Sequence, residues 1–218
     1  MNSKLIKMIA EGEHQRQDFK YCINDSRKIA RSMVAFANTD GGRLLLGIRD
    51  NGSVAGVQSD EEYYMAEAAA KLYSKPPIVF QTHQWLIEGK TVLEINISKS
   101  SEAPHIAQNE EGKWLVYIRK EDQNIVAPGI LLKVWEQQKS IQGVHIRFTD
   151  EEKQLFSLLD SNKYLSLNQF SRQANLPRWK GEKLLVKLIV VGVVGMEITV
   201  TGTRFFLRDD FDSFRTLI

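Results

Sequence analysis

The hydrophobic pattern of this chain changes character near Thr149, and this change constrains the fold more than any other feature. Before residue 140, short helical segments alternate with strand-like apolar runs, whereas beyond Thr149 three helical segments are followed by a hairpin pattern. A chain of 218 residues is long enough for one or two domains. We therefore predict an α+β protein with a mixed α/β domain over residues 1–140 and a second domain over residues 148–210, joined by a linker.

The first domain is predicted to contain a mixed or antiparallel sheet. Its most distinctive strand is Arg43–Arg49, whose nearly continuous apolar residues are typical of a strand buried on both faces. Asn24 or Asp25 can cap the helix before it, and Gly41-Gly42 predicts a tight turn from that helix to the strand. The other expected helices cover residues 4–10, 59–73 and 130–138, and the other expected strands cover residues 15–21, 78–86, 91–98 and 113–119.

The second domain is predicted to be a winged helix-turn-helix module. Thr149 can cap its first helix, and further helices are expected at 166–174 and 178–189, before a hairpin over 193–207. Three helices followed by a hairpin in about 60 residues is the winged-helix arrangement, a variant of the helix-turn-helix.

Charge is distributed unevenly along the chain. The whole chain has a formal net charge of +2, but residues 161–208 hold eight Lys or Arg and only two Glu. On a helix, Lys180, Lys183 and Lys187 share one face. We expect this face to contact DNA phosphates, together with Arg178 and with Arg204 on the wing. The alternatives are a solvated face or a protein-contact module.

The chain has one cysteine, Cys22, so it cannot form an internal disulfide, and a reducing compartment is expected. Its first residues lack the apolar core of a signal peptide. The longest apolar run, Leu188–Met196, is shorter than half of the roughly 20 residues that span a bilayer. We therefore expect a cytoplasmic protein without membrane contact.

One set of motifs in the first domain is specific in combination: Glu13, Asp18-Phe19-Lys20, Ala35–Gly42, Leu46–Gly52, Gly56, Ala103-Pro104-His105 and Val116–Arg119. It resembles the Schlafen AlbA-type domain over roughly residues 8–128, although Asp18 stands where that family usually has Glu. Bacterial members commonly lie beside helix-turn-helix modules and are described as DNA-binding or transcription-regulator domains. The resemblance therefore implies nucleic-acid binding, and Lys20 and Arg119 are candidate phosphate contacts.

The same resemblance suggests an enzyme alternative. Some animal Schlafen proteins are metal-dependent endoribonucleases with three carboxylates, and the matching positions here are Glu13, Asp18 and Asp50. Clustered carboxylates hold divalent cations that polarise a phosphodiester and activate water. Glu13 and Asp18 are five residues apart, however, so on one continuous strand they would point to opposite faces, and the triad requires the chain to bend between them.

We therefore interpret the chain as a nucleic-acid-binding protein, a DNA-binding transcriptional regulator that binds duplex DNA, rather than an enzyme. Because winged-helix regulators often match paired half-sites, we also hypothesise a homodimer. The alternatives are a metal-dependent endoribonuclease and a protein-interaction adaptor. No cofactor is expected unless a divalent metal serves the nuclease.

Overall fold

The computed structural model describes residues 3–57, 59–140 and 149–208. The chain divides into two compact units, Met1–Ala127 and Pro128–Ile218. The predicted linker falls largely on residues 141–148, outside the described residues. In the part that is described, no helix is both long and apolar enough to cross a membrane.

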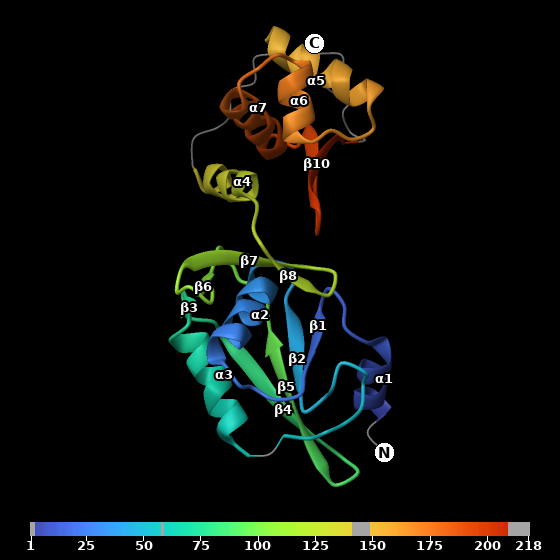
Figure 1. Ribbon diagram of the computed structural model, residues 1–218, viewed down its shortest axis with the longest axis vertical. Coiled ribbons are helices and arrows are strands. Elements are labelled where there is room, and N and C mark those ends of the chain that lie inside the picture. Colours follow the sequence, from blue (N-terminus) through green and yellow to red (C-terminus); the bar gives the residue numbers. More distant parts are fainter. Residues whose placement is uncertain (1–2, 58, 141–148, 209–218) are drawn as a thin grey trace. The chain divides into compact units, whose positions relative to one another are not determined.

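The first unit is built on a four-stranded sheet in the order β1–β2–β5–β4 (Figure 1). Its strands are β1 (Gln17–Lys20), β2 (Gly42–Leu46), β4 (Phe80–Ile87) and β5 (Lys90–Ile97). Helix α2 (Ser26–Asn38) connects β1 to β2, which are parallel, and all the other pairs in this sheet are antiparallel. The side chain of Asp25 caps α2 by accepting a hydrogen bond from the Arg27 amide at 2.8 Å, as the sequence predicts.

Helices cover both faces of this sheet. Helix α1 (Ser3–Glu11) packs on one face, and Leu45 belongs to the hydrophobic cluster there. Helices α2 and α3 (Glu61–Lys71) pack on the other face, where Leu44 and Leu46 are buried. Alternate side chains of β2 thus enter two different cores. This confirms the prediction that the apolar run at Arg43–Arg49 is a strand buried on both faces.

A second sheet in the same unit has the order β3–β6–β7–β8 and is antiparallel throughout. Its strands are β3 (Ser74–Lys75), β6 (Ile106–Gln108), β7 (Trp114–Lys120) and β8 (Gln123–Val126). Sequence patterning predicted only β7, because two to four residues are too few to show an alternating pattern. Helix α2 lies between the two sheets (Figure 1).

The turn from α2 to β2 requires glycine. Gly41 has φ +70°, and its amide donates a hydrogen bond to the Phe36 carbonyl at 2.9 Å, which closes the helix end. A Cβ atom on Gly41 would lie 2.8 Å from the Ile97 carbonyl oxygen and 2.9 Å from the Lys99 amide. The predicted tight turn is therefore present, and it presses against the end of β5.

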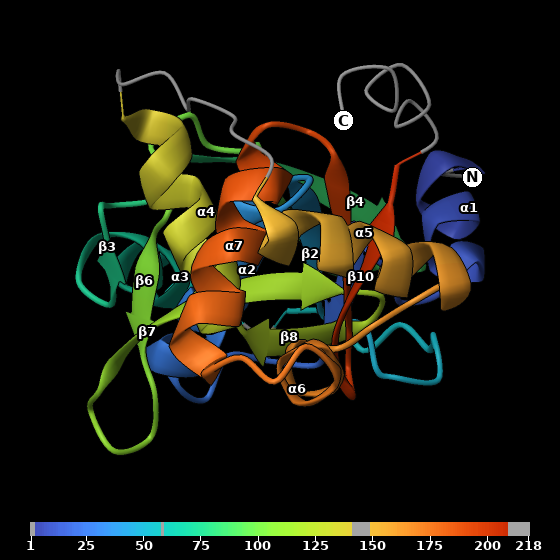
Figure 2. The ribbon, with the colours of Figure 1, turned by 90° about the horizontal axis from the view of Figure 1, so that it is seen from above.

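The second unit contains four helices and a hairpin among its described residues (Figure 2). They are α4 (Gly129–Lys139), α5 (Asp150–Ser161), α6 (Leu167–Gln173), α7 (Arg178–Val190), β9 (Val194–Thr199) and β10 (Gly202–Leu207). Thr149 caps α5, as predicted, and it does so in a capping box with Glu152. Leu165 pairs with Phe205 of β10, so a third extended segment lies beside the hairpin.

The boundary between the units lies before α4. The sequence pattern predicts this helix within a first domain that ends at residue 140, whereas Ile130 and Val134 belong to the core that contains Leu155, Phe170 and Leu188. In Figure 2, α4 lies beside α7. Periodicity shows that α4 has an apolar face but does not show what covers this face. Its partner, α7, is about 50 residues further along the chain.

Candidate nucleic-acid interface

The end of α2 is a hydrogen-bonding hub for the first unit. The Asn38 side-chain amide donates to the carbonyls of His105 at 2.9 Å and Tyr117 at 2.8 Å, and its oxygen accepts from the His105 amide at 2.7 Å. The Thr39 hydroxyl accepts from the Arg119 amide at 2.9 Å. These contacts give Asn38 and Thr39 structural roles, because they hold the second sheet against α2.

Arg119 lies at the centre of a buried charge cluster. Its side chain is 1% exposed, and one Nη lies 3.5 Å from Asp18 Oδ1, whose side chain is 4% exposed. The guanidinium also donates to the Gln17 carbonyl at 3.1 Å and to Asn124 Oδ1 at 3.1 Å. This burial and the pairing with Asp18 disfavour Arg119 as the predicted phosphate contact.

Lys20 is held by the same carboxylate. Its Nζ lies 2.8 Å from Asp18 Oδ2 and donates to the Phe19 carbonyl at 2.7 Å. The Lys20 side chain is 35% exposed, so the edge of this ion pair reaches the surface. The two oxygens of Asp18 thus face two different cations. Lys20 can contact a phosphate only if its ion pair with Asp18 breaks.

Glu13 and Asp18 come together because the chain bends between them. His14 and Gln17 form an isolated antiparallel bridge, so Glu13 lies beside β1 rather than on it. Glu13 Oε1 accepts a hydrogen bond from the Phe19 amide at 2.8 Å. Burial raises the pKa of Glu13 above its ordinary value of 4.5, and a hydrogen bond with Asp18 raises this pKa further.

Asp50 does not join the other two carboxylates in a metal site. It is exposed in the turn after β2, and the described ranges contain no group of three His, Cys, Asp or Glu side chains that could hold a metal ion. Lys20 and Arg119 already neutralise Asp18. The three carboxylates therefore do not fit a divalent cation.

In the second unit, two of the three lysines predicted to contact phosphate instead bind α5. Lys180 forms an ion pair with Glu151, and Lys187 forms one with Glu152, whose side chain is 2% exposed. Burial acts to raise the pKa of Glu152, but hydrogen bonds from Lys187 and Thr149 outweigh it and hold this pKa below its usual range. These ion pairs hold α7 against the first turn of α5.

Arg204 on β10 is also paired. Its guanidinium makes two hydrogen bonds to the Glu197 carboxylate, at 2.9 and 3.0 Å, and lies over the Tyr164 ring at 4.3 Å from the ring centroid. Because both side chains are partly exposed, this pair is accessible on the hairpin surface. The pairing does not favour Arg204 as a predicted phosphate contact.

A different set of cations is exposed on α6 and α7. Lys183, Arg172 and Arg178 are exposed, and Arg178 donates a hydrogen bond to the neutral Asn168 side chain rather than to a carboxylate. Trp179 beside them is 66% exposed. The predicted site residues include Arg178 and Lys183 but neither Arg172 nor Trp179. The spacing of Trp179 and Lys183, four residues apart on one helix face, is the sequence signal that could have identified Trp179.

The family model for "Schlafen, AlbA_2" matches residues 13–128, which is more than half of the chain. The chain belongs to the Schlafen AlbA_2 family. This confirms the resemblance drawn from the motifs, and membership of the family suggests a nucleic-acid-related role. The AlbA_2 match begins at Glu13 and ends at Pro128, so it covers nearly the whole first unit.

Two solved structures are similar to this AlbA_2 chain. The crystal structure of the DIP2311 protein from Corynebacterium diphtheriae has 17% identity and a TM-score of 0.46, over 68% of this chain and 34% of that chain. The solution structure of the N-terminal domain of a RecG-related protein from Nitrosomonas europaea has 19% identity and a TM-score of 0.42, over 67% of this chain and 97% of that chain. The AlbA_2 chain thus spans about a third of the DIP2311 chain. No curated protein matches the chain.

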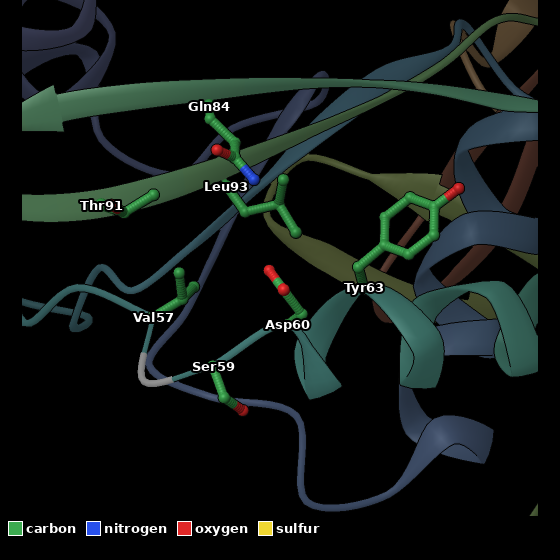
Figure 3. Close-up of a pocket in the computed structure, with 7 residues that line it drawn as sticks. All are labelled: Val57, Ser59, Asp60, Tyr63, Gln84, Thr91 and Leu93. Atoms are coloured by element: carbon green, nitrogen blue, oxygen red, sulfur yellow. The ribbon is translucent and has the colours of Figure 1, made fainter.

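The AlbA_2 unit also has a shallow pocket of about 400 Å³ between the start of α3 and the β4–β5 hairpin (Figure 3). Gln84 and Leu93 lie on the strand side, and the carboxylate of Asp60 points into the space between them and the helix. Asp60 is the single charged side chain among the residues shown lining this pocket. A negative lining disfavours phosphate, so we do not assign this pocket to nucleic-acid contact.

Proposed function

We propose that this AlbA_2 protein is a DNA-binding transcriptional regulator that contacts duplex DNA through α6 and α7 of its second unit. The observation that carries the proposal is the group of exposed cations on these two helices: Arg172, Arg178 and Lys183. None of the three has a carboxylate partner among the described residues. Phosphate contacts of this kind supply most of the affinity of a protein for DNA.

The arrangement of the second unit supports a winged-helix interpretation. Helices α6 and α7 approach closely, because a Cβ on Gly181 would lie 2.9 Å from the Ser171 hydroxyl oxygen. The β9–β10 hairpin, with Leu165 paired to Phe205, corresponds to a wing with its third strand. In such modules the first half of the second helix of the turn enters the major groove, and that half of α7 carries Arg178, Trp179 and Lys183.

The expected phosphate contacts on α7 are therefore Arg178 and Lys183. Lys180 and Lys187, which the sequence pattern suggested, are engaged with Glu151 and Glu152, so using them would break ion pairs that hold the unit together. Arg178 and Lys183 can contact phosphate without that cost. The endoribonuclease alternative is not part of the proposal, because its three carboxylates do not form one site.

Duplex-DNA affinity of the full chain tests the proposal. Changing both Arg178→Glu and Lys183→Glu should weaken binding at least about tenfold and lower the slope of log affinity against log salt by about two. Lys153→Glu is the control for Arg178→Glu and Lys183→Glu measured singly, because each of these variants changes the net charge by two and Lys153 is an exposed cation of the same unit on α5. Equal effects of the control, or unchanged binding by the double variant, would contradict the assignment.

A wild-type chain that binds no duplex would instead support the protein-interaction adaptor.

The homodimer is also part of the proposal, because two copies would present two such modules to paired half-sites. Its test is the molar mass of the chain in solution, measured by light scattering with and without a palindromic duplex. A complex that keeps one chain per duplex would exclude the paired arrangement.

A further inference from the structure

A hollow of about 500 Å³ lies beside the glycine turn of the first unit. Three segments that are distant in sequence line it: the turn before β1, the turn from α2 to β2, and the end of β5. The polar side chains that line it are Arg16, Asp40, Arg43, Asn96, Ser98 and Lys99. The lining includes no aromatic residue and one apolar side chain, that of Ile97.

Hydrogen-bond donors exceed acceptors in this hollow. Arg16 and Lys99 are exposed, and in the described part of the chain neither side chain has an ion pair or a hydrogen bond. The side chains of Asn96 and Ser98 also have no hydrogen-bond partner there. By contrast, the carboxylate of Asp40 already accepts a hydrogen bond from Gln15 at 3.0 Å.

The third cation is restrained at the rim of the hollow. Arg43 Nε donates to Gln17 Oε1 at 2.8 Å, and an Nη lies 3.4 Å from Glu11. Arg43 therefore adds positive potential while Arg16 and Lys99 supply the unpaired donors. Three cations and one carboxylate line the hollow, so its lining carries a net positive charge that favours an anion.

The backbone holds the three segments in fixed positions. The Arg43 amide donates to the Arg16 carbonyl at 2.9 Å, which joins the first segment to the second. The tight approach of Gly41 to Ile97 and Lys99 joins the second segment to the third. A site held in this way binds a ligand with little loss of chain entropy, because its backbone is ordered beforehand.

We propose that this hollow binds a phosphate of a nucleic-acid backbone, through Arg16 and Lys99 with Asn96 and Ser98 as neutral donors. Proteins commonly hold phosphodiester oxygens with charged and neutral donors of this kind. A free nucleotide fits less well, because its base would find no aromatic surface on which to stack. The inference takes its ligand class from the proposed function but assigns a separate contact in the other unit.

The first test uses the double change Arg16→Glu and Lys99→Glu in the full chain. Duplex affinity should fall about tenfold, and the slope of log affinity against log salt should fall by about 0.9, as for one lost phosphate contact. The matched control is Lys7→Glu with Lys28→Glu, which changes the net charge equally at two exposed cations of the same unit. Equal losses in both double variants, or no loss in the first, would overturn the inference.

The second test uses inorganic phosphate as the probe and amide chemical shifts as the readout. Saturable shifts at Gly41, Gly42 and Lys99, which disappear in Arg16→Glu, are expected whether or not the second unit binds DNA. The absence of such shifts would overturn the site. Shifts together with failed duplex binding would preserve the anion site but refute the proposed function. Tighter binding of ATP than of an oligonucleotide would refute the backbone assignment.

Discussion

The two units use positive charge in different ways. In the first unit, Arg119 and Asp18 are almost completely buried and face each other, whereas in the second unit Lys180 and Arg204 form ion pairs that remain partly exposed. All three cations have the spacing or motif position expected of a phosphate contact. The comparison teaches that the availability of a cation depends on its partners in space, which neither its motif nor its helix face reveals.

The free energies associated with the two kinds of pair also differ. Removing one partner of a buried pair leaves an uncompensated charge in a medium of low polarity, whereas an exposed pair exchanges its partner for water. The first unit should therefore depend on its charge cluster for stability. Most paired cations of the second unit should be replaceable, and the exception should be Lys187, which contacts the buried Glu152.

Arg119→Met should have the largest effect. It leaves Asp18 buried with only Lys20 as an ionic partner, and should lower the free energy of unfolding by about 3–5 kcal/mol. Urea denaturation, with hydrogen exchange of the β1 and β7 amides to identify the unit, measures this loss. Arg204→Met is the comparison in the second unit, and it should lower the urea midpoint of that unit far less. Similar shifts for both variants would refute the contrast between the units.

Gly41→Ala should have the next largest effect, because the new Cβ would meet backbone atoms at 2.8 and 2.9 Å in a backbone conformation unfavourable for alanine. We expect a loss of roughly 2 kcal/mol or more. In the second unit, Gly129→Ala is the matched control, since nothing lies within 4 Å of its Cβ position at the start of α4. Thermal unfolding should show the first variant destabilised and the second unchanged or more stable.

Glu152→Gln should destabilise the second unit by about 2 kcal/mol at pH 7, because Lys187 loses its charged hydrogen-bond partner. The pKa of Glu152 is lowered in the folded chain, so the stabilisation is present above the ordinary value of 4.5 and is lost as pH falls through the folded value. Urea unfolding at pH 7 and below pH 4.5 should show this difference shrinking. A difference independent of pH would show that packing, not the ion pair, is responsible.

Glu13→Gln should change stability least, and unlike the preceding variants it should not destabilise the chain. The pKa of Glu13 is raised in the folded chain, so its ionised form disfavours folding at neutral pH, and this cost disappears as pH falls from the raised value to 4.5. The variant should be as stable as the wild type or slightly more stable at pH 7, with no such advantage below pH 4.5. A carboxyl NMR titration with its midpoint at or below 4.5 would contradict this interpretation.

Several features of the fold could be predicted from local sequence. The capped starts of α2 and α5, the strand buried on both faces and the glycine turn each follow from residues within a few positions of one another. The family, too, could be recognised from its motifs, and the matching family model confirms it. The short strands β3, β6 and β8 could not be predicted, because they are defined by their pairing and not by an alternating pattern.

The sequence by itself therefore determined the kinds of element, the family and the presence of excess positive charge in residues 161–208. Only the tertiary structure decided which charges are available: it buried Arg119 against Asp18, about 100 residues away, and it paired Lys187 with Glu152. It also brought Arg16 and Lys99 to one hollow. The physical reason is that helix and strand periodicity are local properties, whereas the burial and pairing of a charge depend on which distant segments pack around it.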